Sequence, residues 1–122
     1  MILVILLNTV ILEVKKSKFV GYYYKIDSIE EIESILVSLK KAHKKARHLP
    51  YAYKFGSMLK KSDDKEPTNT AGVPILNIIE KKQMDNVLIV IVRYFGGVKL
   101  GAGGLIRSYG KCANLVSEKE NR

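Results

Sequence analysis

Two short segments concentrate the residues that could bind a ligand or take part in catalysis. The first, residues 62–72, reads SDDKEPTNTAG, and the second, residues 96–104, reads GGVKLGAGG. Each segment precedes a stretch whose apolar residues have helical spacing. A helix N-terminus carries backbone N–H groups without partners and a partial positive charge, so both segments are suited to binding an anion.

The glycine-rich segment 96–104 predicts a site for a phosphate or another anion. Glycine leaves the backbone N–H groups unobstructed, and a nearby lysine and arginine would add charged donors. The anion-binding candidates are Gly96, Gly97, Lys99, Gly101, Gly103, Gly104 and Arg107. Glycines can equally allow a strand–helix junction to pack tightly without a ligand, and Ala102 stands where a Walker A motif needs lysine. Both interpretations therefore stay open.

The acidic segment 62–72 allows three interpretations. Asp63, Asp64 and Glu66 could hold a divalent cation, act as acid–base groups opposite the glycines, or fix the turn and cap the next helix. His48 could act as a general base, although a lone histidine is more often a packing or surface residue. The other candidates in this loop are Ser62, Thr70, a possible helix N-cap, and Gly72.

Composition limits the class of protein. The 122 residues are 47% hydrophobic and 27% charged, which suits a single domain with a real core. The formal net charge of +9 favours an anionic partner such as nucleic acid, a ribosome or a phosphorylated small molecule. A single cysteine, Cys112 on an apolar helical stripe, and two histidines lead us to expect a reducing, cytoplasmic location, with no metal site and no cofactor.

Hydrophobic periodicity predicts the elements that must position these segments. In chain order we expect a hairpin over 10–24, a helix over 29–45, a strand over 51–55, a loop over 60–70, a helix that begins at 71 or 73 and ends at 82, a strand over 86–93 and a helix over 105–119. The N-terminal apolar run is interrupted by Asn8 and Thr9 and is too short to span a membrane, so we interpret it as a strand region.

This order predicts an α+β fold, a two-layer sandwich of a mixed sheet with helices on one face. The uninterrupted apolar run 87–92 is typical of the central strand. We also expect loop 62–72 to pack beside residues 96–104, since both are unusual helix entries in one small domain.

Four motifs stand in order along most of the chain: KKSKF at 15–19, His48 followed by YAY at 51–53, SDDKEPTNTAGVPIL at 62–76, and VRYFGGVKLGAGGLIRSY at 92–109. They closely resemble the YigZ-like family, which shares its domain with the N-terminal region of bacterial YigZ proteins and with eukaryotic IMPACT proteins. The resemblance implies a fold like the second domain of ribosomal small-subunit protein five. That superfamily is rich in nucleic-acid and nucleotide binders.

The resemblance also implies translational control through protein partners, as in the eukaryotic members. Bacterial members usually carry a second, ferredoxin-like C-terminal domain, which residues 1–122 lack, so we expect either a natural single-domain form or a truncated one. This chain has Lys65 where the family usually has glycine, and Asn69 where it often does. Lysine is the harder fit if that position needs a positive φ.

Three hypotheses for function follow. The first is a cytoplasmic RNA- or ribosome-binding module linked to translation regulation. The second is an enzyme acting on a phosphorylated or nucleotide-like substrate between loop 62–72 and residues 96–104. The third is a regulator that binds a protein of the translation machinery without catalysis. None of the three requires a membrane.

Overall fold

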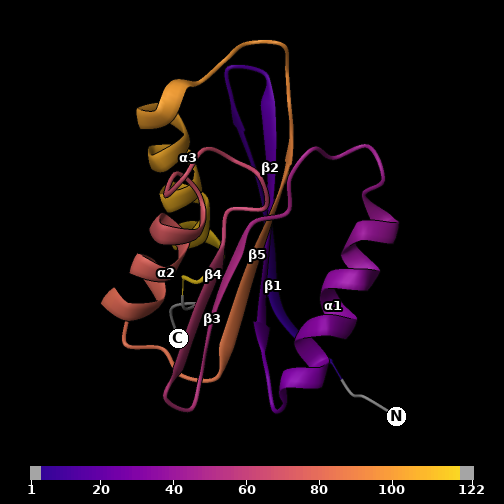
Figure 1. The fold of residues 1–122 in the computed structure, drawn as a ribbon, viewed down its shortest axis with the longest axis vertical. Coiled ribbons are helices and arrows are strands. Elements are labelled where there is room, and N and C mark those ends of the chain that lie inside the picture. Colours follow the sequence, from indigo (N-terminus) through magenta and orange to yellow (C-terminus); the bar gives the residue numbers. More distant parts are fainter. Residues whose placement is uncertain (1–3, 119–122) are drawn as a thin grey trace.

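The computed structural model describes residues 4–118 and contains eight elements (Figure 1). In chain order they are β1 (Ile5–Val14), β2 (Ser17–Lys25), α1 (Ile29–Ala42), β3 (Tyr51–Phe55), β4 (Met58–Ser62), α2 (Gly72–Lys81), β5 (Val87–Tyr94) and α3 (Gly101–Val116). The predicted α+β class is confirmed. None of the helices in the described residues is long and apolar enough to cross a membrane.

The five strands form one sheet in the order β1-β2-β5-β3-β4. Every pair of neighbouring strands within residues 4–118 is antiparallel, so the prediction of a mixed sheet is wrong. The apolar run in β5 lies at the centre of the sheet, as predicted. The reason is its continuous hydrophobicity, because only a strand covered on both faces can bury every side chain.

Helices cover both faces of the sheet, and the prediction of helices on one face is therefore wrong. Successive residues of β5 point to opposite sides: Ile89 and Ile91 join a core beneath α2 and α3, whereas Leu88 and Val90 join a core beneath α1. Figure 1 shows α1 on one side of the sheet and the other two helices on the opposite side. Two apolar faces on one strand need two covering layers, because a single layer would leave one face in water.

Two boundaries differ from the sequence prediction near the candidate loops. Strand β4 occupies the start of the predicted loop; its residues are mostly exposed and include Lys60 and Lys61, so the edge strand lacks an apolar signal. Helix α3 begins at Gly101 rather than at residue 105. Part of the glycine-rich segment is thus the first turn of α3, because tertiary packing overrides the low helix propensity of glycine there.

Candidate functional site

The two candidate segments line one pocket, which confirms the prediction that they pack together. This pocket has a volume of about 370 Å³, and we call it the loop pocket. Its lining residues are His48, Lys65, Glu66, Pro67, Arg93, Phe95, Lys99, Leu100, Gly101, Ala102 and Leu105. Loop 62–72 forms one wall, and the segment from the end of β5 to the first turn of α3 forms the other.

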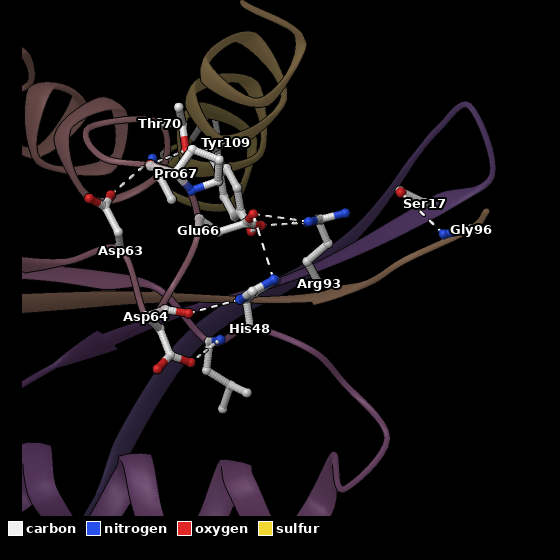
Figure 2. A network of polar contacts seen from close by, with 12 residues as sticks. Ser17, His48, Asp63, Asp64, Glu66, Pro67, Thr70, Arg93, Gly96 and Tyr109 are labelled. Atoms are coloured by element: carbon white, nitrogen blue, oxygen red, sulfur yellow. Dashed lines mark hydrogen bonds and ion pairs between the residues drawn. The ribbon is translucent and has the colours of Figure 1, made fainter. Parts of the chain in front are cut away.

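A buried ion pair forms the floor of the loop pocket. Arg93, near the end of β5, donates from Nε and Nη2 to the two oxygens of Glu66 at 2.5 and 2.9 Å (Figure 2). The hydroxyl of Tyr109 on α3 donates to the same carboxylate. The Glu66 side chain is only 2% exposed. These bonds join the loop, the sheet and α3 at one point.

Burial and charge both act on the titration of this cluster. Burial, followed by the negative charge of Glu66, raises the pKa of Tyr109 far above its usual range. For Arg93, burial alone would lower the pKa, but the hydrogen bonds and the charge of Glu66 more than offset it and raise the pKa. Arg93 therefore stays cationic and Tyr109 stays a neutral donor.

His48 is the titratable side chain placed to reach a ligand in the loop pocket. Its Nδ1 lies 2.8 Å from the backbone oxygen of Asp64, so this nitrogen carries the proton and donates. Its Nε2 lies 3.7 Å from Oε1 of Glu66, and the side chain is 17% exposed (Figure 2). The Asp64 carbonyl therefore orients the ring, and Nε2 is the ring nitrogen that faces Glu66 and a ligand in the loop pocket.

The two aspartates of loop 62–72 accept hydrogen bonds from backbone N–H groups of the protein itself. Asp63 accepts from the backbone N–H groups of Asn69, Ala71 and Gly72 at 2.9, 3.2 and 2.8 Å. Burial would raise the pKa of Asp63, but these three donors lower it overall. Asp64 accepts from the N–H of Leu49 at 2.7 Å. The interpretation that these aspartates fix the turn and cap the helix is thus the one that the structure supports.

The three carboxylates point to different partners and do not converge on a cation. Asp63 faces the start of α2, Asp64 faces the segment before β3, and Glu66 faces Arg93 (Figure 2). Among residues 4–118 there is no group of three or more His, Cys, Asp and Glu side chains that could hold a metal ion. The cation-site alternative is wrong for these residues, because backbone N–H groups and a guanidinium occupy their oxygens.

The remaining candidates in this loop support its shape. Thr70 is not an N-cap: its hydroxyl donates to the Pro67 carbonyl at 2.6 Å, and Ala71 occupies the cap position without a side-chain bond. The Ser62 hydroxyl accepts from the N–H of Asp64 at 3.1 Å. A Cβ on Gly72 would lie 3.1 Å from the backbone of Ser62, so this glycine allows α2 to begin against β4.

The glycines of segment 96–104 have several different roles. A Cβ on Gly96 would lie 2.0 Å from the carbonyl oxygen of Lys16, so Gly96 serves close packing against the β1–β2 turn. Gly97 and Gly101 have φ values of +90° and +73°, which favour glycine. Gly103 and Gly104 lie inside α3. Only the first turn of α3 faces the loop pocket, so the prediction that all five glycines line one anion site is wrong.

Arg107 lies in a second pocket of about 320 Å³, which we call the hairpin pocket because the β1–β2 turn forms one wall. Its lining residues are Val14, Lys15, Leu100, Gly104, Arg107, Ser108 and Lys111. Lys99 lines the loop pocket instead, so the two predicted cations do not share one pocket. The correction follows from the docking of α3 against the β1–β2 hairpin, which places Arg107 beside Val14 and Lys15. Leu100 lines both pockets.

Sequence reasoning missed Phe95 and Lys111. The Phe95 ring is 36% exposed and lies beneath the guanidinium groups of Arg47 at 5.1 Å and Arg93 at 5.9 Å. An aromatic residue directly between a buried strand and a glycine pair was the available signal. Lys111 carried no local signal. Lys15 belongs to the basic KKSKF motif, but only the docking of α3 against the hairpin brings it together with Lys111.

Lys65 occupies a left-handed backbone position with φ of +71°, beside Asp64 at +43°. We expect Lys65→Gly to raise the free energy of unfolding by about 0.5–1 kcal/mol, because glycine adopts this conformation without steric cost. Urea denaturation measures the change. Lys65→Ala is the matched control, since it removes the same charge and keeps the strain. Equal stability of the two variants would show that removing the charge, and not relieving the backbone, is what matters.

Comparison with known proteins places the chain. The model of the Impact N-terminal domain matches residues 15–117. The chain is 42% identical over 101 residues to the IMPACT family member YvyE of Bacillus subtilis (80% of this chain, 46% of that protein). It is 37% identical over 111 residues to the IMPACT family member YigZ of Escherichia coli (87% and 54%). It thus spans about half the length of these relatives.

Solved structures agree with the fold. A crystal structure described as a hypothetical protein superposes with a TM-score of 0.85 at 34% identity, covering 93% of this chain and 58% of that one. The two-domain translational regulator Yih1 superposes with a TM-score of 0.54 at 21% identity, covering 92% and 46%, and this likeness shows the fold alone. The extent of the domain match shows that the chain belongs to the family of the Impact N-terminal domain.

Proposed function

We propose that the chain is a cytoplasmic module that binds RNA, in a role connected with translation. The observation that carries this proposal is a cluster of exposed cations at one end of the sheet. This basic end consists of Lys15, Lys16, Lys18, Arg47, Lys65, Lys99, Arg107 and Lys111, which lie around the end of β5, the β1–β2 turn and the two pockets. A concentrated positive surface attracts phosphate backbones and sets the strength of their binding.

Strand register explains why the cations gather there. Lys18 lies opposite Tyr94 at the end of β5, and the backbone N–H of Arg47 bonds to the carbonyl of Arg93. The β1–β2 turn reaches the same end, where Gly96 packs against Lys16. Loop 62–72 offsets only part of this charge: Glu66 is paired with Arg93, which leaves two aspartates, Asp63 and Asp64, beside eight exposed cations.

Phe95 adds a feature that phosphate attraction alone does not need. Its ring is partly exposed beside two guanidinium groups, at the edge of the loop pocket. Unpaired nucleobases stack on aromatic rings and on arginine planes in many RNA-binding proteins. The connection with translation is part of this proposal; its motive is membership of the Impact N-terminal domain family, whose fold the translational regulator Yih1 shares.

An enzyme acting on a phosphorylated substrate is the second candidate, favoured by one observation. His48 presents Nε2 at the loop pocket, next to Glu66 and across from Lys99. Turnover of a nucleotide or phosphate ester by the wild-type protein, abolished in His48→Gln, would favour this candidate over simple binding.

Charge reversal at the basic end is expected to weaken RNA binding at least tenfold. The test compares Lys65→Glu/Lys99→Glu with a control, Lys25→Glu/Lys81→Glu, which has the same net charge but changes exposed lysines at the opposite end of the sheet. Fluorescence anisotropy with labelled RNA over a salt series gives the affinities, and binding should weaken with salt. Equal losses in both variants would indicate non-specific attraction, and no wild-type binding at low salt would leave the protein-partner hypothesis.

A further inference from the structure

The first turn of α3 separates two pockets that share a wall. Leu100 lines both the loop pocket and the hairpin pocket, one on each side of the helix N-terminus. A ligand that is long and flexible can therefore occupy both pockets by crossing this residue. A small rigid ligand can occupy only one.

The hairpin pocket is lined by cations without a counter-charge. Lys15, Arg107 and Lys111 contribute three positive side chains, and no carboxylate is among the lining residues that the structure describes. All three side chains are exposed and can adjust to an anion. Arginine can bind a phosphate with two parallel hydrogen bonds, and lysines can add charge around it.

The β1–β2 turn keeps these charges despite an unfavourable backbone. Lys15 and Lys16 have φ values of +46° and +72°, a two-residue turn in which asparagine and glycine are preferred. A lysine pair at this position is less stable than Asn-Gly, yet it places a cation on the wall of the hairpin pocket. This strain supports the pocket as a binding feature, and the cavity and its three cations are what identify it.

The loop pocket offers a phosphate position and a stacking surface. Lys99 lines it together with Gly101 and Ala102, and α3 has no side-chain cap at its N-cap residue. The N–H groups of this first turn therefore have no intrahelical or capping partner. Phe95 lies on the same wall with part of its ring exposed.

We propose that the two pockets hold successive phosphates of one single strand of RNA, which crosses α3 at Leu100, while an unpaired base stacks on Phe95. This inference rests on the proposed RNA-binding function and names its substrate class: single-stranded oligonucleotides rather than mononucleotides or duplexes. A duplex has its base faces stacked inside, so it cannot use Phe95. Linking two phosphates makes the second contact intramolecular, so affinity should rise with strand length.

Length-dependent binding provides the test. Labelled oligouridylates of increasing length, a duplex of matched length, and uridine monophosphate as a competitor are measured with the intact protein. Wild type should bind a tetranucleotide at least tenfold more tightly than the monophosphate. Arg107→Gln/Lys111→Gln should reduce tetranucleotide affinity about tenfold and reduce monophosphate affinity less, because the tetranucleotide needs both pockets and the monophosphate only one. The slope of the logarithm of RNA affinity against the logarithm of salt concentration should become shallower by roughly 0.7 for each phosphate that the variant no longer neutralises.

Two further variants separate base stacking on Phe95 from general attraction between the positive protein and RNA. Phe95→Leu should weaken single-strand binding several-fold at an unchanged salt slope, because stacking involves no counterion release. Lys25→Gln/Lys81→Gln, with the same loss of charge at the far end of the sheet, should behave as wild type. RNA binding that is unaffected by Arg107→Gln/Lys111→Gln, or that is equally tight for duplex, would overturn this inference and leave the proposed function standing. Absence of RNA binding by wild type would overturn both.

Discussion

Replacing Arg93 by methionine is expected to lower the free energy of unfolding by about 3–5 kcal/mol, because it leaves a buried carboxylate without its cation. Glu66 is 2% exposed and receives both Nε and Nη2 of Arg93. The Tyr109 hydroxyl remains as a donor but cannot neutralise the charge. Urea denaturation at neutral pH, followed by circular dichroism, gives the change directly.

The matched control for this prediction is the double variant Arg93→Met/Glu66→Gln. It removes both charges, keeps a similar volume at each position and leaves the introduced amide within reach of the Tyr109 hydroxyl. It should recover a substantial part of the stability, because an unpaired buried charge is more costly than the absence of the pair. A decrease below about 1 kcal/mol in Arg93→Met would mean that water or another group satisfies Glu66.

Gly96→Ala is expected to destabilise the protein by more than about 3 kcal/mol. The added Cβ would lie 2.0 Å from the carbonyl oxygen of Lys16, 2.1 Å from its carbon and 2.6 Å from the nitrogen of Ser17. These are backbone atoms of the β1–β2 turn, so no side-chain rotation relieves the overlap. The turn must move away from the end of β5. Thermal and urea unfolding measure the effect.

The same substitution at Gly103 serves as the control for Gly96→Ala. A Cβ there meets only the flexible Arg107 guanidinium, at 3.2 Å, and the residue lies within α3. Gly103→Ala should therefore leave stability unchanged or raise it by up to about 1 kcal/mol, because alanine favours helix. If both variants were equally stable, the contact between the turn and Gly96 would not contribute to the fold.

Elements with a strong local pattern could be predicted from the sequence. The continuous apolar run of β5 is such a pattern. Ser28, three residues before Glu31, is another: this spacing is typical of a capping box, and in the structure the Ser28 side chain accepts from the N–H of Glu31 at the start of α1. Strand β4 lacked such a pattern, because as an exposed edge it carries lysines. The two-sided covering of the sheet was missed because the prediction rested on the order of the elements. The apolar run of β5, which is buried on both faces, was the signal for a second helical layer.

Some features of the candidate site could likewise be predicted from the sequence, and others could not. The sequence indicated that loop 62–72 and residues 96–104 would meet, and they line one pocket. It could not assign the carboxylates, because their partners are distant: Asp64 binds the N–H of Leu49, and Glu66 binds Arg93. Nor could it show that Arg107 and Lys99 would line different pockets, since this depends on how α3 docks against the hairpin on one side and loop 62–72 on the other.

The attachments of loop 62–72 have a consequence for folding kinetics. The loop is held by Leu49 before β3, by Arg93 on β5 and by Tyr109 on α3, elements that are far apart along the chain. Such non-local contacts form after the local ones, since chain entropy opposes them until the rest of the structure is in place. The loop pocket is therefore expected to be complete only after the transition state has been crossed. A ligand that binds there should slow unfolding and leave the folding rate almost unchanged.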